Sequence, residues 1–218
     1  MDLNVLKWLV IGLVIVIAAG GVVVYLAGRA PEDIRGLSAG WRDLARRSRI
    51  VYTPPKNGAL DTARLSGRHR QREVSGAIRI RMAYTGQGAH STQTMLHYTR
   101  LEVSVENPQH AYLRINTKGG YRKTDQFLGQ PLRPLGDPQI DRAFDIKCIP
   151  HDLSEALFAR AGSLREGVLS LARNRYVELE LKGSSVALEQ SGIESDAQRL
   201  LDLFGLLCDL ADAFDALA

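Results

Sequence analysis

The longest hydrophobic stretch of the chain lies close to its first residue and contains no charge. Residues 8–27 read WLVIGLVIVIAAGGVVVYLA, and a helix of this length rises about 30 Å, which matches the hydrocarbon core of a bilayer. Trp8 and Tyr25 lie near its two ends, where amphipathic rings favour the headgroup region. The pattern predicts one transmembrane helix within an anchor of residues 1–28. The alternative is a cleaved signal peptide, but the apolar run continues beyond the small residues Ala18–Gly20.

Hydrophobic residues then recur at helical spacing through a basic segment. Pro31 and the two acids after it are typical of a helix start. Leu37, Trp41 and Leu44 form an apolar stripe between arginines. We therefore expect a basic juxtamembrane helix within residues 29–50. Its apolar stripe either lies on the membrane surface or packs on the domain that follows.

Alternation of apolar and polar residues replaces the helical spacing between residues 63 and 118. Ile78, Ile80 and Met82, for example, alternate with arginines. Such alternation is typical of antiparallel strands with one solvated face. A further short strand is expected at Phe144–Ile149.

The last third of the chain combines two short helices, a hairpin and a longer helix. Capping-box spacings at Asp152 and Ser163 predict the short helices, and the hairpin follows over residues 176–189. The final helix is expected to begin at Ser195, and its leucines either cover the core or form a dimerisation surface. The predicted fold class is α+β, with one N-terminal transmembrane helix followed by a mostly antiparallel sheet, short helices and a long C-terminal helix. The soluble domain would span residues 51–218.

Charge is distributed asymmetrically, although the net charge is only +4. Thirteen lysines and arginines accompany five acids between residues 29 and 81, whereas seven acids accompany one arginine between residues 189 and 218. Basic residues beside a membrane helix favour a cytoplasmic position for the large domain and attract anionic headgroups. We expect a single-pass cell-membrane protein with a lipid-facing basic collar, which consists of Arg29, Arg35, Arg42, Arg46, Arg47 and Arg49. Nucleic acid is not an expected partner, because aromatic residues for base stacking are scarce in the basic segment.

Residues that could carry chemistry are few and lack diagnostic spacing. The chain contains no H-E-x-x-H, C-x-x-C, P-loop or nucleophile-elbow pattern, so we expect no catalysis and no cofactor. Cys148 and Cys208 lie in apolar patterns and are expected to be buried free thiols, with a disulfide as the alternative. Asp137, Asp141 and Asp145 are weak candidates for a divalent-cation site, because spacings of four place them on one side of an extended chain. The alternative is a turn aspartate and two surface acids.

A second candidate site is a basic face of the predicted sheet. Its members are Arg68, Arg70, Arg72, Arg79 and Arg81. Guanidinium groups suit bidentate recognition of phosphate. An ordinary solvated face is the alternative interpretation of the same residues.

One segment, residues 140–146 with the sequence IDRAFDI, resembles the FDxxFxV signature of uncharacterised bacterial membrane proteins of the DUF3137 type. Ile140 stands where the signature has its first phenylalanine. In that group the signature precedes a short helical pair, a hairpin and a C-terminal helix, to which residues 153–172, 176–188 and 195–217 would correspond. The resemblance covers the C-terminal third. It implies a similar fold and no catalytic residues.

These observations lead to three functional hypotheses. The first is a membrane-anchored accessory or assembly protein whose domain binds a membrane-protein partner or the anionic surface of the lipid bilayer. The second is a membrane-tethered ligand-binding or hydrolytic domain that uses the aspartate cluster or the basic sheet face. The third is a homo-oligomer that assembles through the C-terminal helix.

Overall fold

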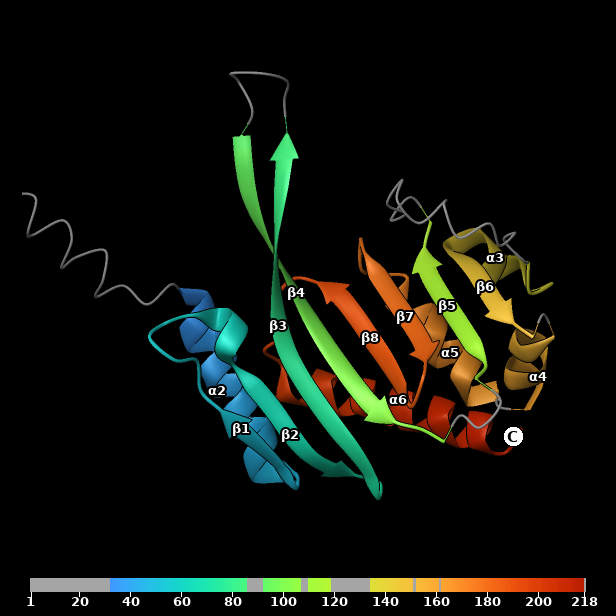
Figure 1. The fold of residues 1–218 in the computed structure, drawn as a ribbon, viewed down its shortest axis with the longest axis horizontal. Helices are drawn as coiled ribbons and strands as arrows, with labels where there is room; N and C mark the ends of the chain where they lie inside the picture. Colours follow the sequence, from blue (N-terminus) through green and yellow to red (C-terminus); the bar gives the residue numbers. More distant parts are fainter. Residues whose placement is uncertain are drawn as a thin grey trace, which may run out of the picture. The chain divides into compact units, whose positions relative to one another are not determined.

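The computed structural model describes residues 32–85, 92–106, 110–118, 134–150, 152–160 and 162–217. The chain divides into two compact units, Met1–Gly36 and Leu37–Ala218, and the described strands all belong to the second (Figure 1). The helices are α2 (Glu32–Arg47), the 3-10 turn η1 (Leu60–Thr62), α3 (Pro138–Ala143), α4 (Leu153–Arg160), α5 (Gly162–Leu171) and α6 (Ala197–Asp215). The strands are β1 (Ile50–Thr53), β2 (Arg64–His69), β3 (Arg72–Thr85), β4 (Thr92–Ser104), β5 (Tyr112–Thr117), β6 (Phe144–Ile149), β7 (Val177–Lys182) and β8 (Ser185–Ser191).

The strands form one eight-stranded antiparallel sheet in the order β1-β2-β3-β4-β8-β7-β5-β6. Strands β1 to β4 follow one another as a meander, as the alternating pattern predicts. The hairpin β7–β8 then lies between β4 and β5, so the last hairpin of the chain joins the meander to the pair β5–β6 (Figure 1). The expected α+β class and the expected antiparallel sheet are therefore confirmed.

The core lies between one face of this sheet and helix α6. The register aligns a row of apolar side chains across five strands, and each is at most 2% exposed: Leu101, Leu188, Leu179, Ile115 and Ile146. Leucines and phenylalanines of α6 are buried against it, among them Leu200, Leu203, Phe204, Leu207 and Phe214. The helix crosses behind the sheet (Figure 1), and its apolar stripe covers the core of its own chain.

Helix α2 packs on the domain through the apolar stripe that the sequence predicts. Leu37, Trp41 and Leu44 are completely buried. The Trp41 indole Nε1–H donates a hydrogen bond to the carbonyl oxygen of Glu194 at 2.9 Å, and the ring meets Tyr52 edge-on at 5.8 Å. Of the two interpretations of this stripe, packing on the domain is confirmed.

The transmembrane part of the predicted fold class requires correction. In the part of the chain that the structure describes, no helix is both long and apolar enough to cross a membrane. The longest, α6, has four aspartates and an arginine distributed along it. Residues 8–27, to which the sequence assigned the span, lie outside the described residues, as do Trp8, Tyr25 and Arg29. The fold class that the structure supports is therefore α+β with an eight-stranded antiparallel sheet, and the predicted N-terminal transmembrane helix is not among the described residues.

Two local expectations have different outcomes. Cys148 and Cys208 are both buried and form no disulfide with each other, as their apolar surroundings predicted. Helix α6 begins one residue later than the capping-box spacing indicated, because Asp196 is its N-cap and accepts a hydrogen bond from the Arg199 backbone N–H at 2.9 Å. A short carboxylate fulfils this role as well as a hydroxyl.

Candidate functional site

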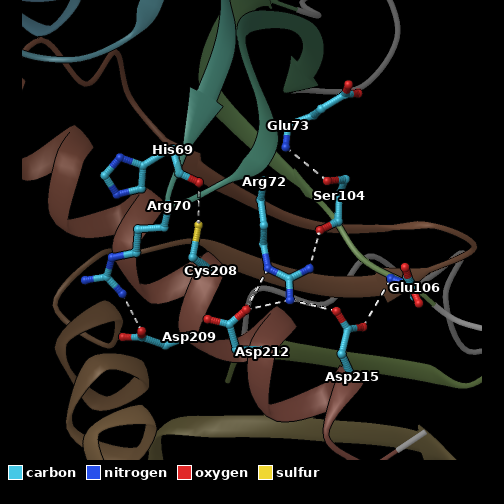
Figure 2. A network of polar contacts seen from close by, with 10 residues as sticks. All are labelled: His69, Arg70, Arg72, Glu73, Ser104, Glu106, Cys208, Asp209, Asp212 and Asp215. Carbon is cyan, nitrogen blue, oxygen red and sulfur yellow. Dashed lines mark hydrogen bonds and ion pairs between the residues drawn. The ribbon is translucent and has the colours of Figure 1, made fainter.

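The turn between β2 and β3 places two arginines against the acidic face of α6. Arg70 and Gln71 adopt positive φ angles of 48° and 71° and form the turn. The Arg70 guanidinium donates to Asp209 at 2.5 Å, and the Arg72 guanidinium donates to Asp212 at 2.5 Å and to Asp215 at 2.7 Å (Figure 2). Asp209, Asp212 and Asp215 of α6 are therefore the ion-pair partners of the turn arginines.

A second set of contacts holds the same turn in place. Arg72 Nη1 donates to the Ser104 carbonyl oxygen at 3.0 Å, and the Glu106 backbone N–H donates to Asp215 at 3.1 Å (Figure 2). The Cys208 thiol contacts the His69 carbonyl oxygen at 3.7 Å, and burial raises the pKa of this thiol to about 11. The thiol therefore stays protonated at neutral pH, which does not favour a nucleophilic role.

The predicted basic sheet face is dispersed by the strand register. Arg72 lies on the α6 side and is paired there, whereas Arg79 and Arg81 lie on the opposite side of β3, among the odd-numbered residues. Arg81 pairs with the Glu189 carboxylate, which is 2% exposed. Arg68 lies on β2, next to His69, and its side chain is exposed. The five arginines therefore do not form one surface.

Charged side chains on the sheet face away from α6 neutralise one another. The Arg114 guanidinium donates to Glu178 at 2.8 Å, and the Tyr176 hydroxyl donates to the same carboxylate at 2.8 Å. Burial raises the pKa of Glu189, and the positive charge of Arg81 opposes that shift. The Tyr176 pKa is raised by burial and by its hydrogen bond to Glu178. These contacts join β5 to β7 and β3 to β8, and they serve as structural pairs.

The basic collar is exposed along its described part. Arg42, Arg46 and Arg47 of α2 and Arg49 after it are all exposed, and Arg47 pairs with Asp43 at 2.6 Å. Arg35, in the other compact unit, is also exposed. The C-terminal end of α2 therefore presents several unburied cations to the surroundings of the domain.

A cavity of about 1060 Å³ joins the end of this collar to the β2–β3 turn. Arg47 and Arg49 line it from α2 and the residues after it, and Arg68 and Arg70 line it from β2 and the turn. The spacing of these residues along the chain gives no sign of their meeting, because pairing of β1 with β2 is what brings residue 50 opposite residue 67. Two predicted sets of arginines thus meet in one place.

The three candidate metal ligands have separate structural partners. Asp137 caps α3 by accepting the Gln139 backbone N–H at 2.9 Å. The Asp141 carboxylate accepts the backbone N–H groups of Leu135 and Gly136 at 2.7 and 2.9 Å, while Asp145 lies within strand β6. In the described parts of the chain, no group of three or more His, Cys, Asp or Glu residues is arranged to hold a metal ion.

Asp137 gives a direct prediction for acid conditions. Its hydrogen bonds with Arg165, at 2.5 Å for Nε, lower the pKa of the carboxyl from 3.8 to about 2. A lowered native pKa means that the pair stabilises the fold above about pH 4 and that this contribution is lost as the pH falls towards 2. We expect an NMR titration to place the Asp137 midpoint well below those of exposed aspartates. Arg165→Met should raise the midpoint but leave it below the ordinary range, because the backbone N–H groups of Gln139 and Ile140 still donate to Asp137. An unshifted midpoint in the wild type would contradict the contact.

The feature that the sequence analysis missed is a ribbon that extends beyond the sheet. Strand β2 pairs with β3 only up to Ala77, and β8 pairs with β4 only from Thr99. We call the remaining part, residues 79–85 and 92–98, the β3–β4 ribbon. It is two-stranded except at its base, where Tyr98 bridges to Gly192, and it rises clear of the neighbouring strands in Figure 1. The signal in the sequence is the length of its two alternating segments.

The β3–β4 ribbon carries most of the exposed large hydrophobic side chains of the described chain. Of six such residues, four lie on it: Ile80 (37% exposed), Met82 (49%), Met95 (59%) and Leu96 (39%). Met82 and Met95 are direct cross-strand partners, and Ile80 lies two residues before Met82. Side chains of opposed residues and of alternate residues share a face of a ribbon. Ile80, Met82 and Met95 therefore form one apolar face.

Comparison with known proteins relates this chain to others by its fold. The sequence matches no protein-family model and no curated protein, so the DUF3137 resemblance stays a prediction. Among solved structures, the fold is similar to the crystal structure of the mycobacterial trehalose monomycolate transport factor A, TtfA, with a TM-score of 0.50 and 10% sequence identity. The match covers 82% of this chain and 94% of that chain. At this identity, the similarity is one of fold.

Proposed function

We propose that this chain is a non-catalytic accessory factor of a transport process at a membrane, which acts by binding a membrane-protein partner through the β3–β4 ribbon. The observation that carries the proposal is the exposed apolar face of Ile80, Met82 and Met95 on a ribbon that leaves the sheet. The fold similarity to TtfA, which is named as a transport factor, supports the transport part of the proposal.

The physical character of the ribbon supports protein binding. An isolated two-stranded ribbon is marginally stable in water, and its outer edges offer unpaired backbone groups to another chain. Methionine side chains are flexible and polarizable, which suits them to irregular apolar surfaces. A partner that covers Met82 and Met95 would remove apolar area from water and fix a segment that has little support from its own domain.

The exposed arginines at the end of α2 support a position beside a membrane. Arg42, Arg46 and Arg49 are exposed and form no ion pair with the residues that the structure describes. A basic side chain near an anionic membrane surface contributes about 1 kcal/mol of binding free energy. The partner in this proposal is accordingly a membrane protein whose surroundings carry anionic lipid.

The test compares two exposed apolar sites in the full-length chain. Tagged wild type, Met82→Asp/Met95→Asp and Val51→Asp are expressed in the native cell, and their complexes are purified from membranes in a mild detergent. Val51 lies on β1, away from the ribbon, and is 63% exposed, so it controls for loss of surface hydrophobicity. We expect the ribbon variant to recover at least about tenfold less of one membrane protein, and the control to recover the wild-type amount.

Each alternative result argues against the proposal. Equal recovery by the ribbon variant and the wild type would show that the ribbon is not the docking surface. Recovery of only a second copy of the chain would make the ribbon a self-association surface. If the protein lost by the ribbon variant has no part in transport, the transport role is wrong even though the docking surface is right.

A further inference from the structure

The cavity between the end of α2 and the β2–β3 turn has a lining suited to an anion. Its four arginines outnumber its two aspartates, Asp202 and Asp209. Asp209 is paired with Arg70 at 2.5 Å, and Asp202 accepts a hydrogen bond from Gln198 at 3.0 Å. Asp209 is therefore neutralised by Arg70 while Asp202 keeps its negative charge, and the four arginines still leave an excess of positive charge in the lining.

Two of the arginines are left for a ligand. Arg49 and Arg68 are exposed and form no ion pair with any residue in the described ranges, although both line the cavity. Arg49 immediately precedes β1 and Arg68 lies in β2, and the two are neighbours because Ile50 is the register partner of Gly67. A guanidinium group offers a planar fork of donors that matches two oxygens of a phosphate group.

A helix start also lines the cavity. Ser163 lies in the first turn of the ten-residue helix α5 and also lines the cavity. The first N–H groups of a helix and the positive end of its dipole favour an anion. The cavity is thus lined by two cationic side chains, Arg49 and Arg68, and by a helix start that adds neutral N–H donors. The two arginines are the main support for an anion site.

We propose that this cavity binds a phosphorylated polar group through Arg49 and Arg68, with the start of α5 as a further donor. The volume of about 1060 Å³ exceeds that of a phosphate ion and lies near the upper end of the usual range for small-molecule sites. The ligand is accordingly a phosphate with a polar substituent, such as a phospholipid headgroup or a free phosphorylated polyol. This site is separate from the β3–β4 ribbon and does not depend on the proposed docking function.

The imidazole of His69 also lines the cavity and is neutral at physiological pH. His69 lines the same cavity, and burial together with the positive charge of Arg70 lowers its pKa. It is therefore neutral at physiological pH and offers the ligand one hydrogen-bond donor and one acceptor. We expect binding to depend little on pH between 7 and 8.

The experiment measures binding to the purified full-length chain by calorimetry. The probes are glycerol 3-phosphate, glycerol as its uncharged counterpart, and dihexanoyl phosphatidylglycerol below its micelle concentration. The cavity variant is Arg49→Gln/Arg68→Gln. The control is Arg142→Gln/Arg173→Gln, which removes the same charge from exposed positions outside the basic collar that do not line the cavity.

We expect at least one phosphorylated probe to bind and glycerol not to bind. The cavity variant should weaken that binding at least about tenfold, with less than a twofold change in the control. Binding of glycerol 3-phosphate would identify a free phosphorylated ligand, and binding of the short-chain lipid alone would identify a headgroup. Equal weakening in the two variants would reduce the effect to net charge, and absence of binding by both phosphorylated probes would overturn the proposal.

Discussion

Replacing Trp41 by alanine is expected to lower the free energy of unfolding by about 3–5 kcal/mol, the usual cost of removing a buried tryptophan side chain. The indole is completely buried, contacts the Tyr52 ring and donates to the Glu194 carbonyl oxygen at 2.9 Å. Its loss opens a cavity beneath α2 and leaves that carbonyl group without its indole partner. Urea unfolding followed by circular dichroism measures the change.

A second substitution separates packing from hydrogen bonding at the same position. Trp41→Phe keeps most of the apolar volume and removes the Nε1–H donor, so we expect a smaller loss of unfolding free energy, dominated by an unpaired carbonyl group that costs about 1–3 kcal/mol. An alanine variant within 1 kcal/mol of the wild type would show that α2 is not docked as the structure has it.

Replacing Gly40 by alanine is expected to destabilise the fold, although alanine is the better helix former. A Cβ atom at residue 40 would lie 1.5 Å from the carbonyl oxygen of Ser195. The segment before α6 is itself held, since the Glu194 backbone N–H donates to Thr99 Oγ1 at 2.8 Å. Helix α2 would have to move away from it, and overpacking of this kind typically costs about 1–3 kcal/mol of unfolding free energy.

The matched control lies one turn earlier in the same helix. No described atom lies within 4 Å of a Cβ at Gly36, so Gly36→Ala should gain the helix-propensity difference of about 1 kcal/mol. The two glycine-to-alanine changes are therefore expected to shift the urea midpoint in opposite directions. Midpoint shifts of the same sign would contradict the close approach of Gly40 to Ser195.

Docking of α2 also matters for the proposed phosphate site. Arg47 and Arg49 reach the cavity from the end of this helix and the residues after it. A variant that displaces α2, such as Gly40→Ala, is therefore expected to weaken phosphate binding while Gly36→Ala leaves it unchanged. The apolar stripe of α2 therefore positions the arginines at its C-terminal end beside the cavity.

Much of the fold could be predicted, because the spacing of apolar residues along the chain reflects which face of each strand or helix is buried. The alternation between residues 63 and 118 reflects strands with one face on α6, and the leucine spacing of residues 200–214 reflects the covering helix. The strand order could not be predicted in this way. Insertion of β7–β8 between β4 and β5 depends on long-range pairing, which local patterns do not encode.

The surface features were harder to predict because they depend on what lies opposite each residue. The sequence shows arginines at 70 and 72 and aspartates at 209 and 212, but only the packing of α6 on the turn pairs them. The ribbon exists because β3 and β4 extend beyond their pairing with β2 and β8. Alternation alone does not show this, so it places Met82 on the same face as the buried Ile78.

The most direct test of the proposed docking function is photocross-linking from the ribbon in native membranes. A photoreactive amino acid is placed at Met95 in one version of the full-length chain and at Val51 in another, both exposed positions. We predict that residue 95 forms a covalent adduct with the same membrane protein that the Met82→Asp/Met95→Asp variant loses, and that residue 51 does not. Adducts of equal yield from both positions, or an adduct only with a second copy of this chain, would contradict the proposed function.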